Sequence, residues 1–203
     1  MEAVRRRVVR IALVLLALAG FSAQAGAGLG NTAIVHGKPD GRIPGWAIVT
    51  GAPKGWTVDC CTYAAAIGVN AVLYRGEWTG KPQRVMVLNV WPRKLPTLAA
   101  EVQADRKRYR QADPAAKVTA IVAHNPAMRC AATRYQGTDH VDDAVVFCDP
   151  GRASGIRLSW SISFDDGDPA QAALLADFMR VVAASRYMHY VASPAAASSA
   201  RGK

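Results

Sequence analysis

Cys130 and Cys148 lie at equal distances from residue 139, which stands in the middle of a polar loop. The segments on either side of this loop, 131–136 and 143–148, are predicted as strands. In a hairpin that is symmetric about residue 139, the two cysteines face each other. Opposed positions of an antiparallel pair bring their Cβ atoms to about 4–5 Å, close to disulfide range. The sequence therefore predicts an antiparallel hairpin that is closed by a Cys130–Cys148 disulfide.

The chain has four cysteines, and the other two, Cys60 and Cys61, are adjacent. In an exported protein four cysteines indicate disulfides, and they allow three pairings. With Cys130 and Cys148 joined, Cys60 and Cys61 either form a second, vicinal bridge or remain free thiols. The ligands of zinc and copper sites are usually spaced by two or more residues. We therefore expect no metal and no cofactor.

The first 25 residues have the three parts of a secretory signal peptide. An apolar segment, Ile11–Phe21, follows a cluster of arginines, and Ala23-Gln24-Ala25 offers a small-x-small cleavage pattern. The apolar segment is 11 residues long, too short to cross a hydrocarbon core of about 30 Å. We expect Sec-type export, removal of residues 1–25 and no stable membrane span afterwards. The arginines of the leader are Arg5, Arg6, Arg7 and Arg10.

The whole chain of 203 residues carries 25 Lys and Arg against 15 Asp and Glu, a formal charge of +10. The leader contains four of the arginines and one glutamate, so 21 basic and 14 acidic residues remain, a charge of +7. Such a surface favours anionic partners. We expect a bacterial protein of the periplasm or the medium, with an envelope protein or other anionic partner and no nucleic acid. The oligomeric state stays open.

The clearest strand is 156–164, in which Ile, Leu, Trp, Ile and Phe alternate with Arg and three serines. This period of two predicts a strand with one buried and one solvated face. Segment 84–91 is largely apolar on both faces, which predicts a central strand covered on both sides. Further strands are expected at 46–50, 56–60, 71–75 and 117–123.

Two helices are predicted. The first covers 98–111, with Thr97 as its N-cap and Asp113-Pro114 as its stop. The second begins at Asp168-Pro169, where Asp168 is the N-cap and Gln171 completes a capping box. Its buried stripe consists of Leu174, Leu175, Phe178, Val181, Val182 and Ser185.

The domain organisation follows from these elements. Residues 26–45 contain six Gly and two Pro and are expected to form an irregular N-terminal arm. Residues 46–191 are expected to form a single α+β domain, and 192–203 a disordered tail. Hairpin-linked strands are antiparallel, and the two separated helices have to cover sheet faces. The predicted fold class is therefore α+β, an antiparallel β-sheet flanked by two main helices.

Three groups of polar residues are candidate functional sites. Asp165-Asp166-Gly167-Asp168 begins like a calcium loop, but Ala176 occupies the position of the required glutamate. Capping accounts for Asp168, and an irregular divalent-cation site there stays open. His140 and its neighbouring aspartates suit a hairpin turn better than a catalytic cluster. Beside His124 the chain has no G-x-S-x-G nucleophile motif, so we expect no catalytic residue. The aspartates next to His140 are Asp139, Asp142 and Asp143.

The last half of the first helix carries four positive charges within DRKRYR, residues 105–110. Cations near a helix C-terminus are favoured by the helix dipole, so a solvated face explains them, and a docking patch for an anionic partner is the alternative. Trp78 lies between Gly76 and Gly80 and is the tryptophan most expected to be exposed; it either anchors recognition or packs over a sheet end. The basic residues are Arg106, Lys107, Arg108 and Arg110.

The chain resembles the PsbP-like family of extrinsic thylakoid-lumen proteins and the related DcrB-like bacterial envelope proteins. The resemblance covers about Trp46 to Met188 and rests on GWTVDC, on VMVLNVW, on the hairpin flanked by cysteines, and on the terminal strand and helix RLSWSISFDDGDPAQAALLADFMRVVAAS. It implies an α/β/α sandwich without catalytic apparatus that binds a protein complex and sometimes a divalent cation. It assigns no functional residue.

Three functions are compatible with these observations. The leading hypothesis is an exported, non-enzymatic binding or accessory protein that docks on an envelope protein partner. An immunity-type inhibitor of a secreted toxin is the second. A small periplasmic hydrolase that uses His124 or His140 with carboxylates is the third.

Overall fold

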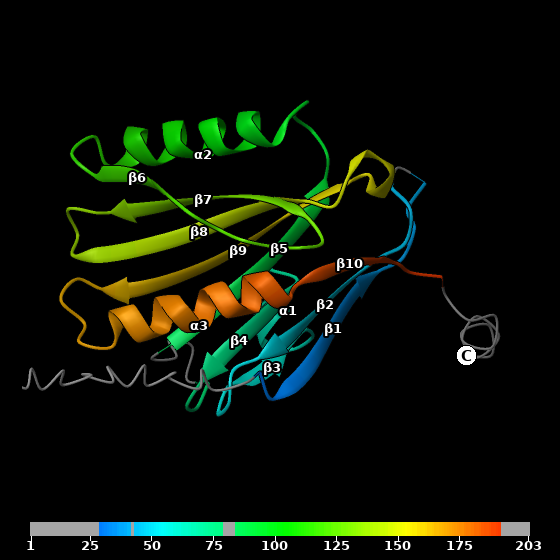
Figure 1. Cartoon of the computed structure of the whole chain (residues 1–203), viewed down its shortest axis with the longest axis horizontal. Helices are drawn as coiled ribbons and strands as arrows, with labels where there is room; N and C mark the ends of the chain where they lie inside the picture. Colours follow the sequence, from blue (N-terminus) through cyan, green and yellow to red (C-terminus); the bar gives the residue numbers. More distant parts are fainter. Residues whose placement is uncertain (1–28, 42, 79–83, 192–203) are drawn as a thin grey trace, which may run out of the picture.

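The computed structural model of the chain describes residues 29–41, 43–78 and 84–191 (Figure 1). The signal peptide expected at 1–25 and the tail expected at 192–203 lie outside these residues. Within them, no helix is long and apolar enough to cross a membrane. The elements in chain order are β1 (Asn31–Gly37), β2 (Trp46–Ala52), β3 (Thr57–Asp59), α1 (Tyr63–Ala66), β4 (Ala71–Arg75), β5 (Arg84–Pro92), α2 (Leu98–Ala112), β6 (Lys117–Ile121), β7 (Arg129–Gln136), β8 (Val141–Asp149), the 3₁₀ turn η1 (Arg152–Ser154), β9 (Ile156–Asp165), α3 (Gln171–Ala184) and β10 (Arg186–His189).

The main layer is a seven-stranded sheet with the order β3-β4-β5-β9-β8-β7-β6. Every neighbouring pair in it is antiparallel. Helices α2 and α3 pack on opposite faces of its β7–β9 part, and Figure 1 shows these strands between the two helices. The predicted α+β class, an antiparallel sheet flanked by two main helices, is confirmed.

The predicted cysteine hairpin is also confirmed. Strands β7 and β8 pair in the register that places Cys130 opposite Cys148, and their Cα atoms are 4.2 Å apart. The two sulfur atoms are bonded. Cys148 is fully buried in the main hydrophobic core, so the disulfide links β7 to β8 on the face of the sheet that α3 covers.

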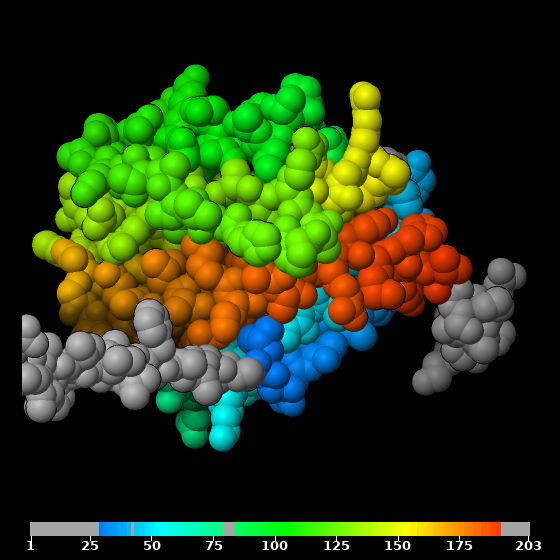
Figure 2. Space-filling model, in the orientation of Figure 1, coloured from blue at the N-terminus to red at the C-terminus, as the bar shows by residue number. Residues whose placement is uncertain are grey.

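The face under α3 holds the main core. Side chains at even positions of β9 and β5, such as Trp160, Ile162 and Leu88, are fully buried there against Phe178 and Val182 of α3. A second, three-stranded sheet of order β1-β2-β10 contributes Val35, Trp46 and Ile48 to the same core, so this face is closed by a helix and a sheet together. Figure 2 shows this side of the molecule, with α3 in orange and β10 in red forming one continuous surface.

The three-stranded sheet corrects the expectation of an irregular arm at 26–45. Residues 31–37 form β1, which pairs with β2 along its whole length. The glycine content misled the prediction, because Gly37 serves packing: a Cβ there would lie 2.4 Å from the Trp46 ring. Strand β10, which was not predicted, pairs with the other edge of β2.

The predicted start of the second helix is wrong by two residues, because the N-cap is Ala170 and not Asp168. Helix α3 begins at Gln171, while Asp168 lies in a preceding turn, where its Oδ1 accepts from the Ala170 amide. Asp168 Oδ2 forms an ion pair with Arg84 at 2.6 Å. The Gln171 side chain bonds Asp142 on β8 and does not reach back to close a capping box. Arg84 and Asp142, both on the sheet, take up the side chains that the local capping box would have used.

The start of α2 agrees with its prediction, because the Thr97 side chain accepts a hydrogen bond from the Ala100 amide at 3.1 Å. The helix ends at Ala112, and Asp113 follows as its C-cap.

The disulfide is expected to stabilise the domain by about 3 kcal/mol, because it closes a loop of 18 residues in the unfolded chain. Urea unfolding of a Cys130→Ala/Cys148→Ala variant measures this loss. The matched Cys60→Ser/Cys61→Ser variant is expected to unfold within about 0.5 kcal/mol of the parent, because both thiols are exposed. Equal stability of the parent and the Cys130/Cys148 variant would contradict the assignment.

Candidate functional site

The two faces of β9 differ in chemistry, and β9 is the central strand of the seven-stranded sheet. Its even positions are apolar and buried, whereas its odd positions are Arg157, Ser159, Ser161 and Ser163. Successive side chains of a strand point to opposite faces, so these four polar residues share the face on which α2 lies. The predicted alternation of this strand is therefore confirmed.

Helix α2 does not lie over β9 itself. Its inner side contacts β7, where the Arg106 Nε donates to the Thr133 Oγ1 at 3.0 Å and Tyr109 stacks on Tyr135 at 4.3 Å. The Tyr135 hydroxyl donates to Asp105. These contacts place the helix to one side of the central strands.

An aromatic cluster covers the same face farther along the sheet, over β4. Trp78 stacks on Tyr63 at 4.7 Å and meets Tyr74 edge to face at 5.3 Å. Of the two alternatives for Trp78, the exposed anchor does not fit the structure, since its indole is half-buried against these two rings. The alternative, packing over a sheet end, is what the structure has.

A groove of about 530 Å³ remains on this face between helix and sheet, and we call it the α2-face groove. Strands β5, β8 and β9 form its floor, and one side of α2 forms its wall. The wall residues of α2 are spaced by three and four positions, as one stripe of a helix requires. The lining consists of Asn89, Trp91, Lys94, Glu101, Ala104, Asp105, Arg108, Val145, Phe147, Ser159 and Ser161.

The middle of the floor is polar and unpaired. Asn89 of β5 lies directly opposite Ser159 of β9, and Ser161 follows on the same face. None of these three side chains forms a hydrogen bond with another residue in the described ranges. Unpaired polar groups on the central strands of a sheet are unusual, because such positions normally lie under apolar packing. The polar groups of the floor are therefore free to form hydrogen bonds with water or with a ligand.

The prediction that 84–91 is covered on both sides is wrong for one side. Met86 and Leu88 are fully buried, but Val87, Asn89 and Trp91 on the other face are half-buried. Periodicity along β5 indicates which residues share a face. It does not indicate that α2 packs on β7 and β8 and leaves β5 uncovered on this side.

The charged groups of the groove are unevenly engaged. Asp105 pairs with Arg108 at 3.2 Å and accepts from Tyr135. Glu101 is only 9% exposed, and its Oε1 is shielded from solvent. Lys94 is exposed and forms no ion pair with any described residue, and 77% of the Arg108 side chain is exposed. The accessible charge of the groove is therefore positive.

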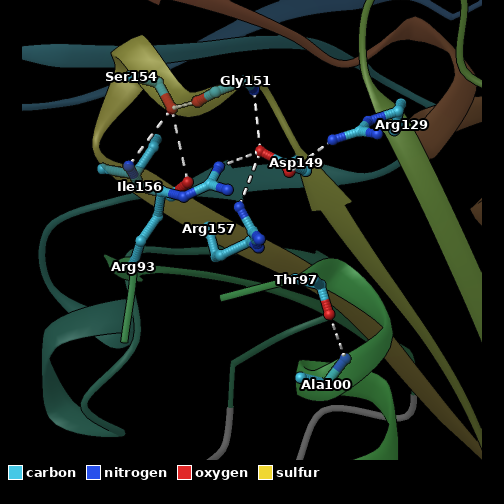
Figure 3. A network of polar contacts seen from close by, with 9 residues as sticks. All are labelled: Arg93, Thr97, Ala100, Arg129, Asp149, Gly151, Ser154, Ile156 and Arg157. Atoms are coloured by element: carbon cyan, nitrogen blue, oxygen red, sulfur yellow. Dashed lines mark hydrogen bonds and ion pairs between the residues drawn. The ribbon is translucent and has the colours of Figure 1, made fainter. Parts of the chain in front are cut away.

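A buried ion cluster closes one end of this face (Figure 3). The Asp149 carboxylate, 1% exposed, receives Arg157 at 2.8 Å and Arg93 from the β5–α2 connection at 2.5 Å. Arg129 of β7 approaches the other carboxylate oxygen at 3.4 Å. The Gly151 amide adds a hydrogen bond of 2.9 Å. The cluster thus ties the segment that leads into α2 to the sheet.

The electrostatics of this cluster depend on burial. Burial by itself would raise the pKa of Asp149, but the Gly151 hydrogen bond and the arginines outweigh it and lower that pKa below its usual value. Desolvation lowers the pKa of Arg157, and the negative charges of Asp149 and Glu101 act in the opposite direction. Arginine titrates far above neutrality, so Arg157 keeps its charge. The fully buried Arg157 cation therefore depends mainly on its ion pair with Asp149, and Glu101 acts on it more weakly.

The four basic residues of the predicted docking patch do not act as one surface. Arg106 points to the sheet and bonds Thr133. Lys107, Arg108 and Arg110 are exposed, and Arg108 also lines the α2-face groove. Trp78 belongs to the separate aromatic cluster over β4. Three of the five residues therefore remain as a basic surface on α2.

Cys60 and Cys61 are exposed, unbonded thiols whose sulfur atoms lie 2.8 Å apart. Their loop is held by Asp59, whose carboxylate accepts from the Tyr63 and Ala64 amides at 2.8 Å. The cysteines and His36 of β1 line one small pocket. Among the described residues, no three His, Cys, Asp or Glu side chains converge in the way that metal ligands do.

The carboxylates near His140 are separated by the sheet. Asp142 bonds Arg134 and Gln171 on the α3 side, whereas Asp143 bonds Ser163 on the α2 side. His140 is exposed and lies 3.8 Å from Asp166. Asp142 and Asp143 point to opposite faces of the sheet because adjacent residues of a strand do so. His124 lies elsewhere, in the β6–β7 connection.

Asp149→Asn is expected to destabilise the protein by about 3–5 kcal/mol, because it leaves Arg157 buried without its main counter-charge. Because the folded-state pKa of Asp149 lies below its unfolded value, this carboxylate stabilises the fold above about pH 4, and the contribution is lost as the pH falls through the folded-state pKa. Urea unfolding between pH 3 and pH 7 is therefore expected to show a shallower pH dependence for the variant.

The matched control is Arg129→Gln, which removes an 83% exposed partner of the same carboxylate. It is expected to cost less than about 1 kcal/mol. A loss as large as that of Asp149→Asn would show that burial does not set the strength of the cluster.

Comparisons with known proteins find a likeness among solved structures only. A scan against protein-family models finds no match, and no curated protein matches the sequence. Among solved structures, the chain is similar to the solution structure of cyanobacterial PsbP (CyanoP) from Synechocystis sp. PCC 6803. The sequence identity is 15%, the TM-score is 0.46, and the match covers 84% of this chain and 99% of that chain.

Proposed function

We propose that the protein is an exported, non-enzymatic accessory protein that docks on an anionic envelope partner through the exposed side of α2. The observation that carries the proposal is the division of α2 into two sides. Arg106 and Tyr109 hold the helix to β7, while Lys107, Arg108 and Arg110 face solvent beside the α2-face groove.

Export is supported by the leader pattern of residues 1–25 and by the Cys130–Cys148 disulfide, since disulfides persist in oxidising compartments. The formal charge of +7 without the leader favours an anionic partner and raises the rate of encounter with it. We place the protein in the periplasm or the medium of a bacterium.

A Lys107→Gln/Arg108→Gln/Arg110→Gln variant is expected to lose at least about tenfold in affinity for the partner, a change of about 1.4 kcal/mol. The control, Lys54→Gln/Arg152→Gln/Arg186→Gln, removes the same charge from three other exposed residues. Immobilised protein is incubated with a bacterial envelope extract, and bound material is quantified by mass spectrometry. The parent and the control are expected to capture the same partner, which 1 M salt releases because the Debye length falls to about 3 Å.

Equal losses in both triple variants would show that net charge alone drives the binding. No reproducible partner, together with turnover of a substrate, would replace the accessory function with an enzymatic one.

A further inference from the structure

We propose that the α2-face groove binds an acidic saccharide, a polyhydroxylated chain that carries carboxylates. This inference rests on the proposed docking function and names the chemistry of the envelope partner. Four properties of the groove carry it: a polar floor without internal partners, an aromatic side chain at one end, accessible positive charge, and a floor whose strands have no free edge.

The floor offers groups that both donate and accept hydrogen bonds. Serine hydroxyls and an asparagine amide each have both capacities, and Asn89, Ser159 and Ser161 use neither with another described side chain. Sugar hydroxyls have the same double capacity and occur in rows along a chain. An apolar occupant would bury these groups unpaired, at about 1–3 kcal/mol each. The floor therefore selects a hydroxylated ligand over an apolar one.

Trp91 adds aromatic surface to this polar row. It is half-buried in the lining and meets Phe147 edge to face at 6.1 Å, so a second ring supports it. Sugar rings have C–H surfaces that pack against aromatic rings, while their hydroxyls reach neighbouring polar groups. Trp91 can pack against the C–H face of a sugar ring while the serines and Asn89 of the floor bond its hydroxyls.

The accessible charge selects an acidic ligand. Lys94 has no ion pair among the described residues, and Arg108 is largely exposed. Of the two carboxylates of the lining, Asp105 pairs with Arg108 and accepts from Tyr135, and Glu101 is only 9% exposed. Carboxylates of the ligand would meet Lys94 on one side and Arg108 on the other.

A peptide strand fits this site less well. Peptides that bind to sheets usually add a strand to a free edge and use its backbone groups. The groove lies on the face of β5 and β9, and each of these strands is already paired on both sides. The backbone of the floor is therefore unavailable, and only side chains can recognise the ligand.

The test uses the full chain and three defined probes: tetragalacturonate, the neutral maltotetraose and the acidic peptide tetraglutamate. Affinity is measured by calorimetry, and the site is located by amide shifts in two-dimensional NMR spectra. Tetragalacturonate is expected to bind with shifts at residues 89, 159 and 161, and to bind at least about fivefold more tightly than either other probe.

Asn89→Leu is expected to weaken this binding at least about tenfold, because it replaces a hydrogen-bonding group with an apolar one. Ser161→Ala and Lys94→Gln are expected to weaken it about threefold to tenfold, and Lys94→Gln also to reduce its salt dependence. Asn31→Leu and Lys54→Gln, two exposed positions away from the groove, are matched controls with less than about a twofold effect. Thermal melting confirms that each variant is folded.

The proposal is overturned if tetragalacturonate at about 10 mM causes no shifts in the groove. It is also overturned if maltotetraose or tetraglutamate binds equally well, or if Asn89→Leu, Ser161→Ala and Lys94→Gln all keep parental affinity. Envelope capture that still depends on Lys107, Arg108 and Arg110 would then leave the docking function standing without a saccharide ligand.

Discussion

Strand β9 lies at the centre of the seven-stranded sheet, where β5 and β8 bond both of its edges, and its sequence gives it one apolar and one polar face. The apolar face, with Trp160 and Ile162, holds the main core and is closed by α3 and by the three-stranded sheet. The polar face offers little apolar area, so packing a helix on it would gain little free energy. Helix α2 instead packs on Tyr135 and Thr133 of β7, and the groove is what remains between.

Local features of the sequence predict much of this fold. The symmetric spacing of Cys130 and Cys148 predicts the register of the hairpin, because strand pairing across one loop depends on few residues. The alternation along 156–164 predicts the two faces of β9, and Thr97 predicts the start of α2. Strands β1 and β10 could not be predicted in this way. Each forms by pairing with one edge of β2, and this pairing depends on the tertiary structure and not on the local sequence.

The candidate site was less predictable than the fold. The sequence indicates the positive charges of α2, but helical periodicity does not show that Arg106 turns to the sheet while Arg108 lines a groove. Asn89 was missed, although it is the one polar residue inside an otherwise apolar strand of VMVLNVW. A lone polar residue at that position, opposite a serine, is the signal that could have identified the floor.

The central claim is that the polar face of β9 is accessible to solvent at Ser161, on the groove floor, while the opposite face of the sheet is closed. The rate of thiol alkylation in the native protein tests it most directly, in a Cys60→Ser/Cys61→Ser background with one new cysteine at a time. Ser161→Cys lies on the groove floor and is expected to react at a rate within about tenfold of an exposed thiol. Ala144→Cys lies on the closed face of β8 and is expected to react only through unfolding. Protection of Ser161→Cys to the level of Ala144→Cys would contradict the account.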